Sequence, residues 1–495
     1  MRDCPMPADS KPIVIAGGGV HGTALAYMLG RKLRRAKSKQ KIILLERYGS
    51  PNTYGSSHGD TRITRFANAE APFLTKTAQA SVHEYSELQK RFRESSTPHM
   101  ARISKILREL YYDDMMFHQT GLLVMGPKGE KGSAHNVADF VQSTIDNAVS
   151  AGIDHEVLSG REVAERFPGY MIRDAELDRI AAYYESGSGT LFPERCVMAQ
   201  RLLAQLYGVQ YRPNTEMKGF RHKKDGVEII LRGGATIDAH RLVLATGAWI
   251  RDFMPDGLDH YFRIQRQVVG WFHVDEPERM DAAHSPNFIV FQHTDKGIKH
   301  NYGFSAQANS MHPGMVKSAF ETGAHIGDPA DKKLRQVHGA ELDEIYNFSS
   351  RFIRGMQRVG AMGQSCRYTN EPQGRLIAAG YPQMDTVDSL NLTRGDMAMA
   401  LPLHELNEND RVVVISACSG HGFKNAMGLA EAVASRMLGQ KGKYDIDLAD
   451  YAWVPPIDKT LVAKLDQVIR AGRLRDADNH GQEKTAGKPG GFNPQ

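Results

Sequence analysis

The sequence has few of the features that mark secreted, metal-binding or membrane proteins. Its 495 residues include only four cysteines, at positions 4, 196, 366 and 418, and no two of them form a CxxC pair. That spacing is typical neither of a disulfide framework nor of a zinc site, so we expect no structural metal and a reducing compartment. No stretch of about 20 apolar residues occurs, and we therefore expect no membrane-spanning segment.

Targeting signals are scarce as well. The N-terminal segment MRDCPMPADSKP has no apolar signal region, and the chain does not end in a peroxisomal tripeptide. These two absences favour a cytoplasmic protein. The net charge of +5 is small for this length, and the sharpest basic run covers residues 31–41. This run is either a nucleic-acid patch or, as we expect, a solvated helix end whose cations face the negative end of the helix dipole. We expect no nucleic-acid partner.

Strand and helix patterns at both ends of the chain predict an α/β fold. Residues 11–46 follow the order strand, helix, strand, and a strand followed by a helix returns between residues 411 and 438. Strand-like runs dominate residues 263–306 between them. This order predicts a nucleotide-binding domain assembled from separated segments, with a mixed-sheet domain inserted. Further helices are expected at residues 73–92, 193–207 and 331–358, a capping box at Ser159 and Glu162, and an insertion or helical excursion at residues 94–118.

A glycine-rich turn joins the first expected strand to the first helix. Gly17, Gly19 and Gly22 form the pattern G-x-G-x-x-G there. The first glycine permits a tight turn, the second lets the backbone approach a pyrophosphate at the helix N-terminus, and the third lets helix and strand pack closely. Glu46, at the end of the second strand, is placed to accept hydrogen bonds from ribose hydroxyls. The motif predicts dinucleotide binding but does not separate FAD from NAD.

Two other segments combine glycine with cationic side chains, and each has two interpretations. Residues 416–424, SACSGHGFK, lead from an apolar strand through a glycine-rich turn into a helix. The helix start either stabilises negative charge on a reduced flavin or is an ordinary turn between strand and helix. Residues 55–65, GSSHGDTRITR, place two arginines three positions apart. Arginine forks suit a carboxylate ligand, but taken by itself the segment favours a solvated surface turn.

Six short segments together resemble the monomeric sarcosine oxidase family, which includes N-methyltryptophan oxidase and pipecolate oxidase. They are GGGVHG, GSSHGDTRITR, ATGAW, RQVVGWF, SCRYT and SGHGFK, and they follow the family's order over roughly residues 11–450. The resemblance implies a discontinuous, Rossmann-like FAD-binding domain of residues 1–95, 165–255 and 365–455. It also implies a mixed-sheet substrate domain of residues 96–164 and 256–364, and leaves residues 456–495 as a partly loose C-terminal extension.

The resemblance also implies roles for individual side chains near the flavin. Cys366 corresponds to the cysteine that holds FAD through a thioether, whereas a lone cysteine would otherwise be taken as a small buried hydrophobe. Arg65 and Lys424 correspond to the pair that binds the substrate carboxylate, and Tyr368 and Tyr302 to aromatic residues near the substrate. The complete set of implied cofactor-binding residues is Gly17, Gly19, Val20, His21, Gly22, Glu46, Arg47, Ser56, Ser57, His58, Thr61, Arg62, Cys366, Gly420, Gly422, Phe423 and Lys424.

Lys317 corresponds to the lysine that promotes reaction of the reduced flavin with oxygen. This assignment depends on its distance from residues 328 and 329, and the alternative is a solvated lysine on a loop. Four residues later the family has a histidine, where this chain has Glu321. That departure means either a different substrate or a local shift in the alignment.

The implied activity is oxidation of an N-alkylated or cyclic amino acid by FAD, giving an imine and, on reoxidation by oxygen, hydrogen peroxide. The expected partners are the small amino acid and oxygen, and a monomer is favoured. Three alternatives stay open at this point: a flavin dehydrogenase that passes electrons to a carrier, a nicotinamide-dependent dehydrogenase, and a flavin-bound protein without catalytic activity.

Overall fold

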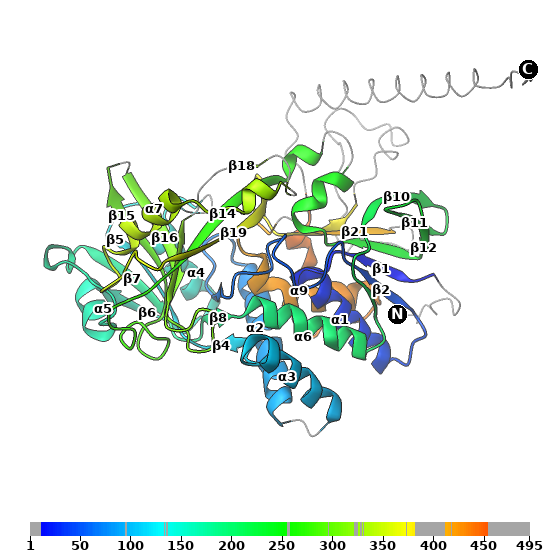
Figure 1. Cartoon of the computed structure of the whole chain (residues 1–495), viewed down its shortest axis with the longest axis horizontal. Coiled ribbons are helices and arrows are strands. Elements are labelled where there is room, and N and C mark those ends of the chain that lie inside the picture. Colours follow the sequence, from blue (N-terminus) through cyan, green and yellow to red (C-terminus); the bar gives the residue numbers. More distant parts are fainter. Residues whose placement is uncertain are drawn as a thin grey trace, which may run out of the picture.

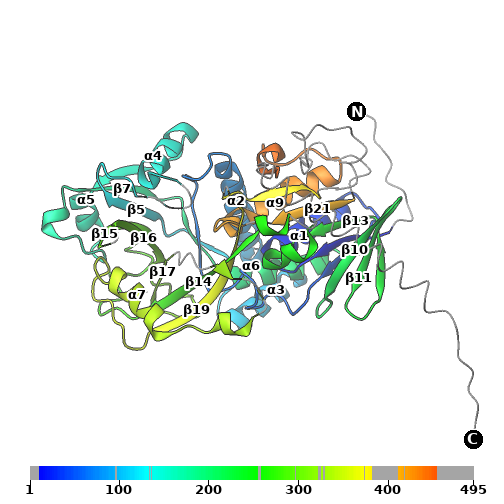
Figure 2. The same ribbon diagram turned by 90° about the horizontal axis from the view of Figure 1, so that it is seen from above.

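Two large sheets, each assembled from segments far apart in the sequence, organise the computed structural model of the chain. Figure 1 shows them side by side, and Figure 2 shows the same arrangement from above. The structure describes residues 11–94, 97–132, 134, 137–254, 258–295, 297–320, 325–326, 329, 331–372, 374–381, 411–416 and 418–453.

The first sheet has six strands. At its centre β1 (Ile13–Ala16) pairs in parallel with β2 (Ile42–Leu45) on one side and β13 (Arg241–Leu244) on the other. Parallel pairs extend it to β9 (Gln210–Arg212) and β21 (Val412–Ser416), and antiparallel β20 (Ile377–Gly380) closes one edge. The order is β20-β21-β13-β1-β2-β9, so three separate parts of the chain form one sheet.

The central strands β1 and β2 are continuous, buried apolar runs because both faces of the sheet are covered there. Ile13 and Ile15 pack in the core shared with the helices, whereas Val14 and Ala16 pack in a second core on the opposite face. The helical face carries α1 (Val20–Arg35), α6 (Pro193–Leu206), α9 (Gly422–Met437) and α2 (Leu74–Glu94), with α1 between α6 and α9 and α2 against α9. The other face carries the antiparallel strands β10 (Met217–Lys223), β11 (Gly226–Leu231) and β12 (Thr236–Ala239).

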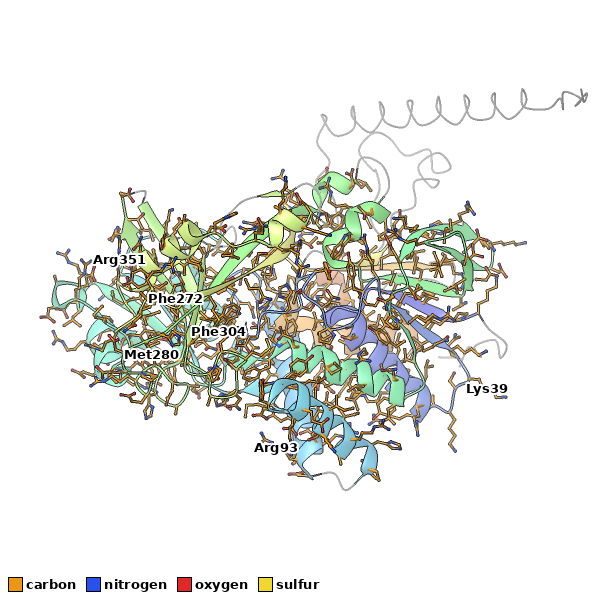
Figure 3. All side chains as sticks on the ribbon, viewed as in Figure 1. Lys39, Arg93, Phe272, Met280, Phe304 and Arg351 are labelled. Carbon is orange, nitrogen blue, oxygen red and sulfur yellow. The ribbon has the colours of Figure 1, made fainter. Side chains whose placement is uncertain are left out.

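The second sheet has nine strands and is mixed. Its order is β18-β14-β17-β16-β15-β5-β7-β6, with β19 paired to β14, and only the β15–β5 pair among these is parallel. The strands are β5 (Leu122–Pro127), β6 (Glu156–Ser159), β7 (Ile180–Glu185), β14 (Arg263–Phe272), β15 (Asn287–Thr294), β16 (Gly297–Phe304), β17 (Val316–Phe320), β18 (His325–Ile326) and β19 (Met362–Asn370). Phe272 and Met280, labelled in Figure 3, are fully buried in the core of this half.

Among the described residues, the helices that cover the second sheet are α4 (Phe140–Ala151), α5 (Gly160–Arg166) and α7 (Gly339–Ser349). The expected capping box is confirmed at the start of α5, where Ser159 and Glu162 bond each other's backbone N–H groups. The helix expected over residues 331–358 is shorter, because α7 ends at Ser349 and a turn follows. A small sheet of β3 (Arg62–Thr64), β8 (Gly189–Leu191) and β4 (Phe117–His118) completes the described strands in this part of the chain.

The sheets divide the chain at other points than the expected domain boundaries. Strand β7 lies within residues 165–255, and most of β19 lies within 365–455, yet both strands pair in the nine-stranded sheet. The helical excursion at residues 94–118 is α3 (Pro98–Tyr111), which packs on α2 and α6 beside the first sheet and not in the substrate half. Pairing between strands that are distant in the sequence decides which sheet each strand joins. Domain boundaries that divide the sequence into consecutive blocks therefore do not follow the sheets.

Three features relevant to the sequence expectations can be read from the described residues. No helix within these ranges is long and apolar enough to cross a membrane. Cys196, Cys366 and Cys418 all carry free thiols. No group of three or more histidine, cysteine or carboxylate side chains in the same ranges could hold a metal ion. The extension of residues 456–495 lies outside the described part of the chain.

A buried carboxylate fastens the segment after α9 to the helical layer. Glu84 on α2 accepts hydrogen bonds from Arg31 on α1 (2.9 Å), from the Lys443 ammonium (2.7 Å) and from the Tyr444 hydroxyl (2.8 Å). Burial favours the neutral acid, but Arg31, Lys443 and Tyr444 lower the pKa of Glu84 to about 2. The stabilisation is therefore present above the usual carboxyl range and is lost only as the pH falls toward 2.

We predict that Glu84→Ala lowers the free energy of unfolding by about 3 kcal/mol at pH 7, because it leaves a mostly buried guanidinium without its partner. Urea denaturation followed by circular dichroism measures the change. Glu109→Ala is the matched control, since Glu109 pairs with Lys105 on the exposed surface of α3 and its loss should cost less than about 1 kcal/mol. Equal costs for the two variants would contradict the prediction.

Candidate active site

A cavity of about 230 Å³ lies at the carboxyl ends of the parallel strands of the first sheet. This edge, where neighbouring connections diverge, is the usual ligand site of such sheets. The wall comes from the turn between β1 and α1, the segment after β2, the segment after β13, and the turn between β21 and α9. Segments from both ends of the chain therefore meet at one cavity, as the sequence predicted.

The glycine turn at this cavity has the geometry that its motif requires. Gly17 has φ of +109°, and a Cβ atom there would overlap the carbonyl oxygen of Ala245. A Cβ atom on Gly22 would overlap the carbonyl oxygen of Gly17, so α1 can approach β1 this closely only without a side chain. Gly19 precedes α1 without a side-chain cap, and the first turn holds no acidic residue. This helix N-terminus therefore offers partial positive charge to an anion.

Glu46 lies at the end of β2, as predicted, and faces the same cavity. Its carboxylate oxygens accept the N–H groups of Gly18 (2.6 Å) and Tyr48 (2.8 Å). Burial raises the pKa of Glu46, while those two N–H donors oppose the rise. Nearby, the Arg47 guanidinium lies 5.3 Å from the centre of the Tyr48 ring and 5.7 Å from that of Trp249. This flat aromatic and cationic surface adjoins the carboxylate.

Several buried polar atoms along the cavity have no hydrogen-bond partner in the described part of the chain. Leaving such an atom unsatisfied costs about 1–3 kcal/mol, so a run of them indicates a polar occupant. The donor and acceptor types fit the pyrophosphate, ribose and flavin edges of a dinucleotide such as FAD. The atoms are His21 Nε2, Thr246 Oγ1, Trp249 Nε1, Thr369 Oγ1 and Ser416 Oγ.

A second, smaller cavity of about 90 Å³ adjoins the first and reaches into the nine-stranded sheet. The two cavities share four lining residues: Arg62, Tyr368, Gly420 and Phe423. A dinucleotide in the larger cavity would therefore meet a small molecule in the smaller one. Aromatic and aliphatic side chains make up about half of the smaller cavity's wall, which also carries four cationic side chains and the carboxylate of Glu70.

Two of these cations are Arg65 and Lys424, which the sequence predicted as a pair. Arg65, 4% exposed, forms an ion pair with Glu70 and lies with its guanidinium 5.1 Å from the centre of the Phe140 ring. Lys424, in the first turn of α9, is 5% exposed, and no hydrogen bond or ion pair to its ammonium is found within the described residues. Burial, and then the charge of Arg65, lower the pKa of Lys424 to about 7. The pair is suited to receive a carboxylate.

Lys317 enters the same cavity from β17. Its ammonium donates to the carbonyl oxygens of Gly59 (2.6 Å) and Thr61 (2.9 Å) and lies 4.7 Å from the centre of the Phe304 ring, which Figure 3 labels. Burial, and then the Arg62 guanidinium, lower the pKa of Lys317 to about 7. This lysine is fully enclosed, which excludes the alternative of a solvated loop residue.

The GSSHGDTRITR segment, residues 55–65, forms the wall between the two cavities. Arg62 donates to the carbonyl oxygens of Thr61 (2.8 Å) and Ser56 (2.9 Å), and the Ser56 hydroxyl donates to the carbonyl of Arg367. Ser57 accepts the first N–H of α1, from Val20, at 3.0 Å. His58, which burial and then Arg62 keep neutral by lowering its pKa to about 3, is inside this wall. The segment is buried structure and not a solvated turn.

Strand β19 carries the expected cysteine and tyrosine into the same region. Cys366 is buried and lines the smaller cavity, and Tyr368 lines both. The hydroxyl of Tyr368 lies 3.0 Å from that of Tyr302 on β16. The remaining predicted residues Gly420, Gly422 and Phe423 form the turn into α9 at the larger cavity. Glu321 lies outside the described residues.

Sequence reasoning missed several residues that the structure brings to the site. Glu70 and His421 both line the smaller cavity, with His421 Nδ1 3.7 Å from a Glu70 oxygen. His300 on β16 lines it too, two positions before Tyr302. The position of His421 inside SGHGFK, and the same-face spacing of His300 and Tyr302 on a strand, were available signals. Glu70 lies in a loop where no sequence pattern indicated a functional residue.

Comparison with known proteins agrees with this geometry. The family model described as FAD dependent oxidoreductase matches residues 12–436. The chain belongs to the FAD-dependent oxidoreductase family. Of the larger cavity's possible dinucleotides, FAD is thus the one that the family binds, and the nicotinamide alternative is not supported.

The resemblance to monomeric sarcosine oxidases is confirmed. The chain is 29% identical over 443 residues to monomeric sarcosine oxidase of Bacillus sp. (strain NS-129), covering 88% of this chain and 95% of that protein. It is 23% identical over 442 residues to N-methyl-L-tryptophan oxidase of Yersinia pestis (strain Pestoides F), covering 89% and 98%. Among solved structures, NikD, an amino acid oxidase essential for nikkomycin biosynthesis, aligns with a TM-score of 0.67 and 16% identity over 91% of this chain and 100% of that one. This last likeness confirms the fold.

The close approach at Gly22 yields a prediction for flavin content. Gly22→Val would force α1 away from β1 and so displace the helix N-terminus from the larger cavity. We expect the purified variant to retain less than roughly a tenth of the wild-type flavin absorbance per protein, the equivalent of at least about 1.4 kcal/mol of lost binding. Gly49→Ala is the control, because a Cβ atom there meets nothing within 4 Å. Full flavin content in Gly22→Val would mean that the glycine turn does not position the cofactor.

Proposed function

We propose that the protein is an FAD-dependent oxidase of N-alkylated or cyclic secondary-amine amino acids. The observation that carries the proposal is the pair of buried cations, Arg65 and Lys424, in a small cavity that adjoins the dinucleotide cavity. The names of the curated relatives support it, since sarcosine and N-methyltryptophan are both N-methylated amino acids.

The two cations would hold the substrate by its carboxylate. Arg65 already pairs with Glu70 and donates to the carbonyl oxygen of Ala67, but its guanidinium has five N–H groups and can donate a further hydrogen bond to a carboxylate. Lys424 adds a point charge whose hydrogen-bonding capacity is not used by the described residues. Both side chains are buried, so their attraction for an anion is screened less than at the surface. Holding one end of the substrate fixes the position of its amine, and such orientation can supply several kcal/mol of the barrier reduction.

Bound FAD would supply the redox chemistry by taking up a hydride equivalent, two electrons and one proton, from the carbon–hydrogen bond next to the amine nitrogen; no side chain can accept it. The nitrogen lone pair then forms the second carbon–nitrogen bond, and the nitrogen loses its remaining proton. The substrate then leaves as an imine that water hydrolyses. The aromatic and aliphatic wall of the smaller cavity would keep bulk water away from the amine while it reacts. Tyr302 and Tyr368, joined through their hydroxyls, would form the polar part of that wall.

Lys317 would supply fixed positive charge for the transfer of electrons to oxygen, which becomes negatively charged as it is reduced and leaves as hydrogen peroxide. An ammonium held in an enclosed cavity stabilises such developing charge without reorganisation of solvent. Its enclosure by Phe304 and by the backbone carbonyls of Gly59 and Thr61 fits this role.

Cys366 would hold the cofactor covalently through a thioether at the flavin 8α carbon. The Cys-Arg-Tyr-Thr sequence supports this assignment, as does the position of Cys366 in the lining of the smaller cavity, two residues before Tyr368, which lines both cavities. We further propose that the chain acts as a monomer, in line with the name of its relatives, with the amino acid and oxygen as its partners.

The substrate proposal predicts a strong preference for the carboxylate. Peroxide production is measured across N-methyl and cyclic amino acids and across the same amines lacking the carboxyl group. Loss of a buried charge partner costs about 2–5 kcal/mol, so each acid should exceed its decarboxylated analogue in kcat/KM by roughly 30-fold or more. Lys424→Met should narrow that ratio, whereas Lys441→Met, at an exposed position, should not. Similar turnover of acid and amine in the wild-type enzyme would rule out the carboxylate site.

The covalent attachment predicts where flavin colour goes on denaturation. After acid precipitation the yellow colour should stay in the protein pellet of the wild type and appear in the supernatant of Cys366→Ala, because only a covalent bond survives unfolding. Cys418→Ala is the comparison variant, since Cys418 lines the larger cavity, whereas Cys366 lines the smaller one. Colour released by Cys418→Ala, or by the unaltered protein, would show that Cys366 is not the attachment site.

A further inference from the structure

One peptide group lies between a carboxylate and the Lys317 ammonium. The peptide joins Gly59 to Asp60. Its N–H donates to both carboxylate oxygens of Glu194, at 3.2 Å each, and its carbonyl oxygen accepts from Lys317 Nζ at 2.6 Å. Because a trans peptide points its N–H and C=O in opposite directions, its dipole is aligned with the field between the two charges.

The backbone conformation that produces this bridge is unusual. Gly59 has φ of +99° and Asp60 has φ of +69°, so two consecutive residues are left-handed. In that conformation neighbouring N–H groups converge, and the Gly59 N–H also donates to Glu194, at 2.7 Å. Without an anion at this point the two N–H groups would lose their common acceptor. The carboxylate therefore stabilises the backbone shape that directs the Gly59 carbonyl at Lys317.

The hydrogen-bond partners of the Lys317 ammonium within the described residues carry no negative charge. Its hydrogen-bond partners are the Gly59 carbonyl and the Thr61 carbonyl and hydroxyl, all of them neutral. Burial, then Arg62 on β3, lower the pKa of Lys317, while Asp60, Cys366 on β19 and Glu194 on α6 raise it. The histidines nearby, His58 and His312, both have lowered pKa values and are neutral at pH 7. Asp60 and Glu194 are thus the carboxylates that sustain the ammonium.

We propose that Glu194 is a positioning residue for Lys317: through the Gly59–Asp60 peptide it holds the acceptor that orients the ammonium and helps to keep it protonated. Glu194 is the second residue of α6, on the far side of the loop from the cavity, and it does not line either cavity. The inference rests on the proposed role of Lys317 in reoxidation. Glu194 acts on oxygen chemistry without touching substrate or cofactor.

The inference fixes the sign of a pH effect. If only protonated Lys317 promotes reaction with oxygen, reoxidation of the reduced enzyme is fast at low pH and falls as the pH rises through the pKa of this lysine, about 7. Burial, and then the charge of Asp60, raise the pKa of Glu194, while the N–H groups of Gly59 and Asp60 oppose the rise by bonding its carboxylate form. Removing the negative charge of Glu194 lowers the pKa of Lys317 further. The falling limb should then move to lower pH.

The test uses Glu194→Gln, which keeps the shape and one acceptor oxygen but removes the charge. Reduced holoenzyme is mixed with oxygen in a stopped-flow instrument across pH 5–9, and the midpoint should move down by about one pH unit. Anaerobic reduction by substrate should change less than twofold. Glu185→Gln is the matched control: Glu185 is buried and accepts two consecutive N–H groups, of Phe66 and Ala67, but its loop does not reach Lys317. The midpoint of the reoxidation pH profile of Glu185→Gln should equal that of the wild type.

A double variant separates positioning of Lys317 from a general loss of structure. In a Lys317→Met background, Glu194→Gln should not slow the reaction of the reduced enzyme with oxygen any further. The pH profile of that reaction should then have no midpoint attributable to Lys317. Equal slowing by Glu194→Gln with and without Lys317, or an unmoved midpoint, would overturn the inference. If Glu194→Gln does not fold, Asp60→Asn, which removes the other carboxylate, should move the midpoint in the same direction.

The outcomes also distinguish this inference from the proposed function. If Lys317→Met reoxidises like the wild type, the oxygen role of Lys317 is wrong. A second measurement then still applies: the absorption spectrum of the flavin is recorded against pH without turnover. A spectral change that is present in the wild type and absent in Lys317→Met reports the protonation of Lys317. An equal spectral midpoint in Glu194→Gln and wild type would overturn the inference by itself.

Discussion

The burial of positive charge around a small cavity is the constraint on which the rest of the site depends. Arg65, Lys317 and Lys424 are each less than about a twentieth exposed, a burial at which an isolated ammonium would shed its proton or destabilise the fold. Two of the three have named partners. Arg65 has a carboxylate partner in Glu70, and Lys317 donates to the carbonyl oxygens of Gly59 and Thr61, the first of which belongs to the peptide whose N–H donates to Glu194. Lys424, in the first turn of α9, has no hydrogen bond or ion pair to its ammonium within the described residues, and the charge of Glu70 raises its pKa against burial and Arg65.

The fold makes this arrangement possible by bringing distant segments together at one edge. β1 and α1 come from the start of the chain and β21 and α9 from near its end, and they meet through β13 at the centre of the six-stranded sheet. The loop of residues 55–65 leaves β2 and passes between the two halves, where β17 and β19 of the other sheet meet it. The cavity junction therefore exists only when both sheets are folded, which couples cofactor binding to the integrity of the whole structure.

The sequence predicted the parts of the site that local motifs encode. The glycine turn, Glu46 and the strand-to-helix turn before Lys424 each combine a pattern with a backbone requirement that few other sequences meet, and all of them lie where expected. The enclosure of Lys317 could not be read in this way, because a single lysine has the same appearance in a loop and in a core. The resemblance to the family identified Lys317 as a candidate. The pairing of β17 with β14 and β16 shows why this lysine is buried.

Residues that act across the fold escaped prediction for a physical reason. Glu194 contacts a loop about 135 positions earlier in the chain, and nothing in its helical surroundings distinguishes it from an ordinary acidic residue in a first turn. The domain boundaries failed for the same reason, since β7 and β19 join their sheet by pairing with strands from elsewhere in the sequence. Long-range pairing is decided by the total packing of the chain and has no local signature.

The charges of the smaller cavity also bear on which form of an amino acid it would accept. Its described lining carries Arg62, Arg65, Lys317 and Lys424 against one carboxylate, Glu70. Cationic side chains therefore outnumber carboxylates in the lining. A zwitterionic amino acid would leave this excess of positive charge unchanged, whereas an amino acid with a neutral amine carries one negative charge and would reduce the excess. Like charges disfavour a protonated amine, so this excess of cationic side chains would favour the neutral form of a substrate amine. The neutral amine is the form with a lone pair on nitrogen, which oxidation of the carbon–nitrogen bond requires. The same cations that hold the carboxylate would thus also prepare the amine for reaction.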